Sequence, residues 1–137
     1  MSCVTVQEEV LYYDTDCGGV VSNIAYLRYV EKSRCALFDK LGMSLKECAE
    51  TQLFPAVVRS EIDYLKPAKL GDKLFITARV KSVEKARLFC EFSISRKDEN
   101  EDDFFLAKAL QMISLIQMPS GRPRRIPPKW SEMEILD

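Results

Sequence analysis

Hydrophobic and polar residues alternate along most of the chain, a pattern typical of strands that bury one face. The alternation is most regular over residues 73–83, where the apolar positions are Leu74, Ile76, Ala78 and Val80. Similar alternation predicts strands at residues 3–13, 55–65 and 87–96. The residues expected on their buried faces are Val4, Val6, Val10 and Tyr12; Val58, Ile62 and Tyr64; and Leu88, Cys90, Phe92 and Ile94, respectively.

The last predicted strand, residues 104–118, is apolar on both faces. Such a strand is covered on both sides or pairs with another subunit, and a single helix cannot cover both faces of a sheet. We therefore expect a homo-oligomer, either a dimer or a tetramer. Four prolines follow within residues 119–137, which predicts an irregular C-terminal tail.

One long stretch with helical periodicity begins near Ser22. Ser22 or Asn23 is a suitable N-cap, and Gly42 suits the position just beyond a helix C-terminus. The helix would be roughly 27 Å long. Its apolar face would contain Tyr26, Tyr29, Val30, Ser33, Leu37 and Leu41. A second, short helical segment is expected at residues 43–51, with Ser44 as its cap.

The predicted order is a strand, a long helix and four consecutive antiparallel strands. This is an α+β arrangement in which one helix lies across a strongly curved sheet. The 137 residues, of which 47% are hydrophobic, are enough for one domain with a sizeable core. We expect residues 1–137 to form a single domain, because the sequence shows no internal repeat and no second domain.

The charged residues are nearly balanced, with 20 Lys and Arg against 21 Asp and Glu and a formal net charge of −1. Proteins that bind nucleic acid are usually more basic, so no nucleic-acid partner is expected. No apolar run approaches the roughly 20 residues of a membrane span, and the N-terminus does not resemble a signal peptide. We expect a cytoplasmic protein.

The sequence contains no histidine and five cysteines. The absence of histidine excludes Ser-His-Asp and Cys-His catalysis and zinc sites built on histidine. The cysteines are odd in number and include no C-x-x-C pair, which indicates free thiols in a reducing compartment. Any chemistry must therefore use carboxylates, backbone dipoles or bound ions, and neither a cofactor nor a protein metal site is expected.

The loop before the long helix, residues 14–21, reads Asp-Thr-Asp-Cys-Gly-Gly-Val-Val. With the helix residues Tyr26-Leu27-Arg28-Tyr29 and Glu31, and the later runs Ile62–Ala68 and Leu70–Asp72, it resembles the hotdog-fold acyl-CoA thioesterases of the 4-hydroxybenzoyl-CoA thioesterase and YbgC-like group. The order of elements matches along nearly the whole chain. The resemblance implies a hotdog fold and hydrolysis of an acyl-CoA to the free acid and CoA. Many members have Tyr-His-Ala-Asn where this chain has residues 22–25, Ser-Asn-Ile-Ala.

The resemblance also implies that Asp16 is the catalytic carboxylate and that a backbone N–H near Asn23 polarises the thioester carbonyl. These two roles suit the reaction, because hydrolysis of an activated thioester needs one base or nucleophile and one donor for the developing oxyanion. A helix N-terminus supplies unpaired N–H groups. Further substrate-binding positions are expected at Gly18, Gly19, Val20, Ser22, Tyr26, Glu31, Arg59 and Lys66, where the basic side chains would suit the coenzyme A phosphates.

Simpler interpretations stay open for several of these residues. Asp16 could merely cap a turn or the helix. The structural roles expected of its neighbours are a turn acceptor for Asp14, a spectator thiol for Cys17, caps for Ser22 and Asn23, a core position for Tyr26 and a surface ion pair for Glu31 with Arg34. Two other functions are open: a thioesterase acting on acyl carrier protein, and a hotdog domain that binds acyl-CoA without turnover.

Overall fold

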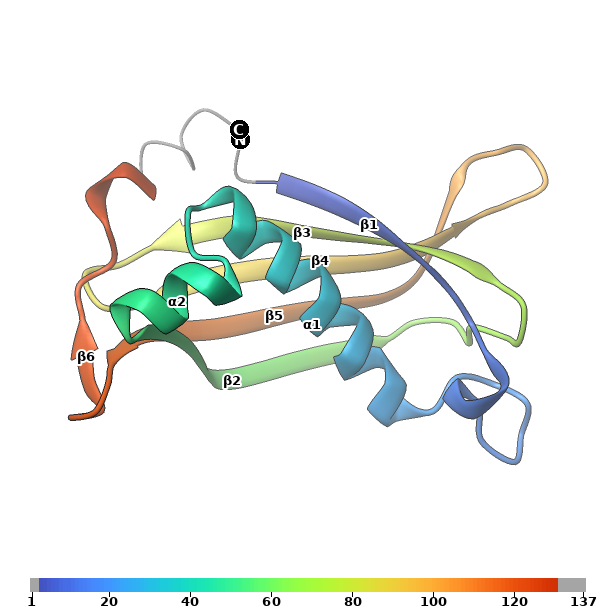
Figure 1. Ribbon diagram of the computed structural model, residues 1–137. Helices are drawn as coiled ribbons and strands as arrows, with labels where there is room; N and C mark the ends of the chain where they lie inside the picture. Colours follow the sequence, from blue (N-terminus) through green and yellow to red (C-terminus); the bar gives the residue numbers. More distant parts are fainter. Residues whose placement is uncertain (1–2, 131–137) are drawn as a thin grey trace.

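The computed structural model describes residues 3–130 and contains a curved antiparallel sheet with α1 lying across one face (Figure 1). The helices include α1 (Asn23–Lys40) and α2 (Leu45–Thr51), and a 3₁₀ turn spans Tyr12–Asp14. The strands are β1 (Cys3–Glu9), β2 (Leu53–Tyr64), β3 (Lys73–Val83), β4 (Leu88–Lys97), β5 (Asp103–Gln117) and β6 (Arg122–Arg124). Their order is β1-β3-β4-β5-β2, with β6 paired to β5. The α+β prediction is confirmed.

α1 begins and ends at the residues that the sequence predicts. The Ser22 hydroxyl accepts the backbone N–H of Ala25 at 3.4 Å, so it caps the N-terminus. Gly42 follows the last turn with φ +84°, a left-handed conformation that glycine adopts without strain. Every residue predicted for the apolar face is buried, namely Tyr26, Tyr29, Val30, Ser33, Leu37 and Leu41.

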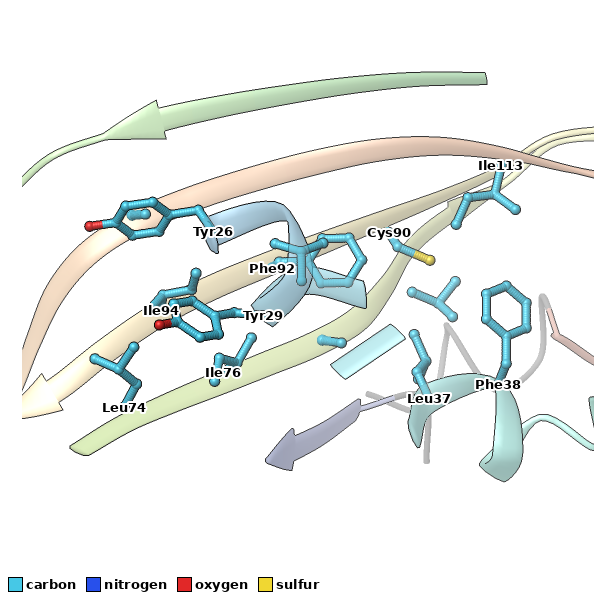
Figure 2. Close-up of a cluster of buried hydrophobic side chains, with 14 of the residues drawn as sticks. Tyr26, Tyr29, Leu37, Phe38, Leu74, Ile76, Cys90, Phe92, Ile94 and Ile113 are labelled. Atoms are coloured by element: carbon cyan, nitrogen blue, oxygen red, sulfur yellow. The ribbon is translucent and has the colours of Figure 1, made fainter. Parts of the chain in front are cut away.

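The hydrophobic core lies between α1 and the middle strands of the sheet. Figure 2 shows side chains of α1, β3 and β4 gathered there. The predicted inward residues of β3 and β4 are all buried: Leu74, Ile76, Ala78, Val80, Leu88, Cys90, Phe92 and Ile94. Burial raises the pKa of the Cys90 thiol to about 12, a shift that the nearby Arg34 charge partly offsets. This cysteine therefore packs as a neutral core residue.

The first strand is shorter than predicted. It ends at Glu9, and Tyr12, expected on the buried face, is 82% exposed. The chain leaves the strand geometry because the Asp14 carboxylate accepts the N–H of Leu11 at 3.0 Å and folds residues 12–14 into a 3₁₀ turn. A short acidic side chain that bonds nearby backbone competes locally with strand pairing.

The expectation that Val58 and Tyr64 of β2 are buried is wrong, because they are 57% and 51% exposed. β2 is an edge strand, and a bulge interrupts its pairing with β5 between Val57 and Arg59. α1 packs mainly over β1 and β3, which lie toward the opposite edge of the sheet from β2. Much of β2 is therefore left uncovered by the helix.

The strand register identifies which β2 residues face the helix. Gln111 of β5 bonds to Arg34 of α1, and its cross-strand partner on β2 is Ser60. Cross-strand partners share a face, as do residues two apart on one strand. Ser60, Ile62 and Tyr64 therefore line the helix-side face next to α1, and we call these three residues the β2 strip.

The C-terminal segment is more ordered than the predicted irregular tail. Arg122–Arg124 pair with β5 as β6, so the prediction is wrong for these residues. Ile126 and Trp130 are buried in the core, and the Trp130 ring packs edge-on against Phe38 with 5.9 Å between centroids. The rest of the predicted tail, residues 131–137, lies outside the described residues. Within residues 3–130, no helix combines the length and apolar character needed to cross a membrane.

Candidate active site

The loop before α1 folds into a small hairpin. Thr15 pairs with Val21, and the N–H of Asp16 bonds to the carbonyl of Val20 at 3.0 Å. A tight turn closes the hairpin, with the N–H of Gly19 on the Asp16 carbonyl at 3.0 Å. Gly19 has φ +76°, where a side chain would be strained. The hairpin places Asp16 opposite Val20. Val20 is three residues before Asn23, the first residue of α1.

Asp14 anchors this hairpin to the rest of the fold. It is only 3% exposed, and its carboxylate accepts the Leu11 N–H and pairs with the guanidinium of Arg28 on α1. Its backbone carbonyl accepts the N–H of Ser22 at 2.9 Å. The pKa of the neighbouring Tyr29 hydroxyl is raised, mainly by burial and to a smaller extent by the Asp14 carboxylate. Asp14 thus has the structural role that the sequence predicts for it.

Asp16 is held far more loosely. It is exposed, and one carboxylate oxygen accepts the N–H of Gly18 at 2.9 Å. The other oxygen has no hydrogen-bond partner among residues 3–130. Asp16 opens on a pocket of about 520 Å³, lined by Tyr12, Thr15, Asp16, Cys17, Gly19 and Leu70. A carboxylate with a free oxygen facing a pocket can act as a base or a nucleophile.

The N-terminus of α1 opens on a second pocket, of about 330 Å³, lined by Val21, Asn23, Tyr26, Tyr64, Leu65, Lys66 and Pro67. The N–H groups of Asn23 and Ile24 meet no acceptor within the described part of the chain. Unpaired N–H groups at a helix N-terminus attract negative charge. This pocket can therefore stabilise an oxyanion.

Two tyrosines form a wall of the second pocket. The Tyr26 hydroxyl accepts the N–H of Ala68 at 3.2 Å, and burial raises its pKa. The Tyr64 hydroxyl donates to the Asn23 carbonyl at 3.4 Å, and the two rings stack edge-on with 5.1 Å between centroids. These contacts connect the end of β2 to the first turn of α1.

The structure brings together some of the predicted site residues and separates others. Asn23, Tyr26 and Lys66 share the second pocket, whereas Asp16 and Gly19 line the first. Gly18 donates its N–H to Asp16, Val20 is half-buried in the hairpin, and Ser22 is the N-cap. Glu31 lies farther along α1 beside Arg34, as in the predicted ion pair, and Arg59 pairs with Glu61 on β2. Neither Glu31 nor Arg59 lines these two pockets.

Sequence reasoning missed Tyr64 as a pocket residue because its alternation with polar neighbours indicated a core position. It also treated Arg34 only as an ion-pair partner. The signal for Arg34 was present, since it lies four residues after Val30 and three before Leu37, inside the apolar stripe of the helix. A charged residue at such a position is half-buried and needs a polar partner.

Known proteins similar to this chain are thioesterases. A family model described as the thioesterase-like superfamily matches residues 10–133. The chain is 30% identical over 119 residues to the acyl-CoA thioesterase YbgC of Haemophilus influenzae, covering 86% of this chain and 84% of that protein. It is 29% identical over 122 residues to an acyl-acyl carrier protein thioesterase of Arabidopsis thaliana, covering 89% of this chain and 62% of that protein.

Solved structures agree with these relatives. A probable thioesterase from Bartonella henselae is 30% identical with a TM-score of 0.76, covering 93% of this chain and 100% of that chain. The 4-hydroxybenzoyl CoA thioesterase of Pseudomonas sp. strain CBS-3 has a TM-score of 0.83 at 20% identity, covering 97% and 99% of the two chains, and shares the fold. With a family model that spans residues 10–133, this chain belongs to the thioesterase-like superfamily and has the hotdog fold.

Proposed function

We propose that this protein is an acyl-CoA thioesterase that uses Asp16 and the backbone N–H of Asn23. It hydrolyses the thioester to the free acid and the thiol of coenzyme A. The observation that supports this most is the loop itself. One short segment carries an exposed carboxylate and then leads into a helix N-terminus; one carboxylate oxygen and two helix N–H groups have no partner within residues 3–130. Relatives that cover most of the chain are named acyl-CoA thioesterases.

The two groups divide the chemistry between them. The N–H of Asn23 donates to the carbonyl oxygen, and this bond strengthens as negative charge develops in the transition state. Asp16 either removes a proton from the attacking water or attacks the carbonyl carbon itself. In the second case water then hydrolyses the resulting anhydride. Both routes release the acid and the CoA thiol, and neither requires a histidine.

We infer that the working site forms in a homo-oligomer. Within one chain, Asp16 and Asn23 open on two different pockets. Large apolar side chains are exposed around the second pocket and along the edge strand β2: Ile24, Leu27, Val57, Val58, Tyr64 and Leu65. An exposed apolar patch and a long edge strand are typical of a surface that pairs with another chain. Light scattering that finds a stable monomer at micromolar concentration would contradict this inference.

Thiol release from a panel of thioesters tests the proposed activity. The panel contains short, long and aromatic acyl-CoAs, and the same acyl groups on acyl carrier protein, because one relative is named for that substrate. Hydrolysis of acyl-CoAs with a kcat/KM well above that of the carrier-protein thioesters supports the proposal. The reverse order would favour the carrier-protein function. Acyl-CoA binding without thiol release would indicate a binding domain and contradict the proposed function.

A further inference from the structure

The Tyr26 hydroxyl, in the pocket at Asn23 (the Asn23 pocket), has no acceptor for its proton among residues 3–130. Tyr26 lines this pocket and is 3% exposed. Its hydroxyl oxygen accepts the N–H of Ala68 at 3.2 Å. A hydroxyl has one proton to donate, and a buried donor without an acceptor is unfavourable. The Tyr26 hydroxyl is therefore suited to donate to a bound molecule.

This hydroxyl lies beside the start of α1. Tyr26 is three residues after Asn23, and residues three apart are neighbours on one face of a helix. Side chains on a helix lean back toward its N-terminus, which carries the hydroxyl toward the first turn. The contact with Ala68 agrees, because the Ala68 carbonyl accepts the N–H of Val21, just before the helix, at 2.8 Å. Figure 2 shows the Tyr26 hydroxyl directed away from Phe92 and the rest of the core cluster.

The surroundings of Tyr26 make such a donor effective. The other residues that line the Asn23 pocket are mostly apolar, and none is acidic: Val21, Asn23, Tyr64, Leu65, Lys66 and Pro67. Because Tyr26 is buried, a hydrogen bond that it donates is stronger than one made in water. The unpaired N–H groups at the start of α1 open on the same pocket. One ligand oxygen can therefore receive donors from the helix and from Tyr26.

The protonation state of Tyr26 also suits a donor. Burial raises the pKa of Tyr26; the hydrogen bond from Ala68 partly offsets this, and Tyr64 and Asp72 add smaller increases. The net direction is upward, so the hydroxyl keeps its proton at neutral pH. A hydroxyl that accepts a hydrogen bond is also polarised, which strengthens the bond that it donates. Tyr26 can therefore stabilise an oxyanion without giving up the proton.

We propose that the Tyr26 hydroxyl is a second donor to the thioester carbonyl oxygen, beside the backbone N–H of Asn23. This inference rests on the proposed function, which binds that carbonyl at Asn23. A thioester offers an oxygen and a sulfur, and the oxygen is the better acceptor because sulfur accepts only weakly. Negative charge collects on this oxygen in the transition state, so both hydrogen bonds strengthen there. Asp16, or the water that it activates, then attacks a carbon whose oxygen is held from two sides.

The contact with Ala68 also gives Tyr26 a structural role, and the test must separate the two roles. Loss of the hydroxyl leaves the Ala68 N–H without this acceptor, so the stability of the protein should fall. A purely structural role would lower the fraction of folded protein or weaken the binding of every acyl-CoA. A donor to the developing oxyanion instead affects kcat and leaves KM nearly unchanged.

Tyr26→Phe keeps the ring and removes the hydroxyl. We expect kcat, for the acyl-CoA that the parent hydrolyses fastest, to fall by roughly 10²-fold, the lower end of the range for one oxyanion donor. KM should change by no more than a few-fold. A folded Tyr26→Phe protein with the kcat of the parent would overturn the inference and leave the thioesterase activity standing.

Tyr29→Phe is the matched control. It removes a buried hydroxyl from the same face of α1, one turn farther on, and Tyr29 lines neither the Asn23 pocket nor the pocket at Asp16. Its kcat should stay within a few-fold of the parent. A loss of kcat in Tyr29→Phe as large as that in Tyr26→Phe would mean that packing of the helix, not a donor in the pocket, is responsible, and would overturn the inference.

A second substitution decides if Tyr26→Phe does not fold, as judged by circular dichroism. 3-Fluorotyrosine in place of Tyr26 keeps the ring, the hydroxyl and the acceptor for Ala68, but fluorine makes the phenol more acidic. Ionisation removes the donated proton, so the fall in kcat at alkaline pH should move to lower pH than in the parent. The same replacement of Tyr29 should leave the pH profile unchanged. An alkaline limb that does not move when Tyr26 is fluorinated would overturn the inference.

Binding decides the inference if the parent protein releases no thiol. Hexanoyl-CoA and S-hexyl-CoA have acyl and alkyl chains of equal length, but the thioether has no carbonyl oxygen. Tyr26→Phe should reduce the preference for the thioester, as the ratio of the two dissociation constants, by roughly two- to ten-fold, since the bond to a neutral carbonyl is modest. That result supports the second donor even though the proposed activity has failed. In such a protein, a preference that Tyr26→Phe leaves unchanged would overturn the inference as well.

Discussion

The two carboxylates of the loop before α1 are two residues apart and have opposite surroundings. Asp14 is 3% exposed, and each of its carboxylate oxygens has a partner, the Leu11 N–H for one and the Arg28 guanidinium for the other. Asp16 is exposed, and one of its oxygens has no partner among the described residues. The contrast shows that the acid with many contacts builds the site, and the acid with few remains available for chemistry.

The backbone N–H at the start of α1 can be removed as a donor without removing the helix. Asn23 is the first residue of α1, where proline is well tolerated, and Ser22 already has the extended conformation that a following proline requires, with φ −70° and ψ 152°. Asn23→Pro should lower kcat by about 10²–10³, the usual effect of losing one oxyanion donor. Asn23→Ala keeps the backbone N–H, so its kcat should stay close to that of the parent. Equal losses in both variants would mean that the side chain, not the N–H, is required.

Asp14 should affect stability more than turnover. Asp14→Asn removes a charge that is bonded to Arg28 and to the Leu11 N–H, so the free energy of unfolding should fall by about 2 kcal/mol. Urea denaturation measures this change, and Asp16→Asn, which removes an exposed carboxylate, is the matched comparison. The contrast between the two acids fails if Asp16→Asn destabilises the protein as much as Asp14→Asn does.

The turn that presents Asp16 should depend on Gly19. Its φ of +76° costs an alanine about 1 kcal/mol, although a Cβ at this position meets no atom within 4 Å. Gly19→Ala should therefore lower the free energy of unfolding by about that amount. Gly121→Ala, at φ +74° with equally open space, is a control at the other end of the sheet. A strain effect predicts similar losses of stability in both variants, with a change in kcat confined to Gly19→Ala.

The smallest expected effect concerns Lys66, which lines the Asn23 pocket. Lys66→Met should raise the KM for acyl-CoA by roughly two- to five-fold at low salt, because an exposed contact to a phosphate is weak and screened. The KM for an acyl-pantetheine, which lacks the nucleotide phosphates, should not change. Arg59→Met should change KM less, since Arg59 pairs with Glu61 outside the pocket. A larger rise in KM for Arg59→Met than for Lys66→Met would indicate that the coenzyme binds over the middle of β2.

The sequence predicted the covered part of this fold well and the uncovered part poorly. β3 and the apolar face of α1 were correct to the residue because both are buried by neighbours within the chain. The same alternation in β2 wrongly predicted buried side chains for Val58 and Tyr64, because β2 is at the sheet edge and α1 packs mainly over β1 and β3. A periodic pattern tells which residues share a face, but not what covers that face.

Prediction of the site had a similar limit. The cap at Ser22 and the structural role of Asp14 follow from local sequence rules, and the structure has both. The Arg34–Gln111–Ser60 cluster joins residues from α1, β5 and β2 that are up to 77 positions apart. No local pattern indicates such contacts, since they depend on the strand register. The catalytic role of Asp16 stays a prediction.

Turnover and binding by a folded Asp16→Asn variant test whether the Asp16 carboxylate performs the hydrolysis. Asparagine keeps the shape of the side chain and removes the charge, so kcat for acyl-CoA should fall by about 10²–10⁴. The helix N-terminus still binds the carbonyl, and the dissociation constant should change by no more than a few-fold. Asp14→Asn and Cys17→Ser should both retain far more activity. A catalytic role of Asp16 is contradicted if Asp16→Asn keeps kcat within a few-fold of the parent, or if Cys17→Ser is the inactive variant.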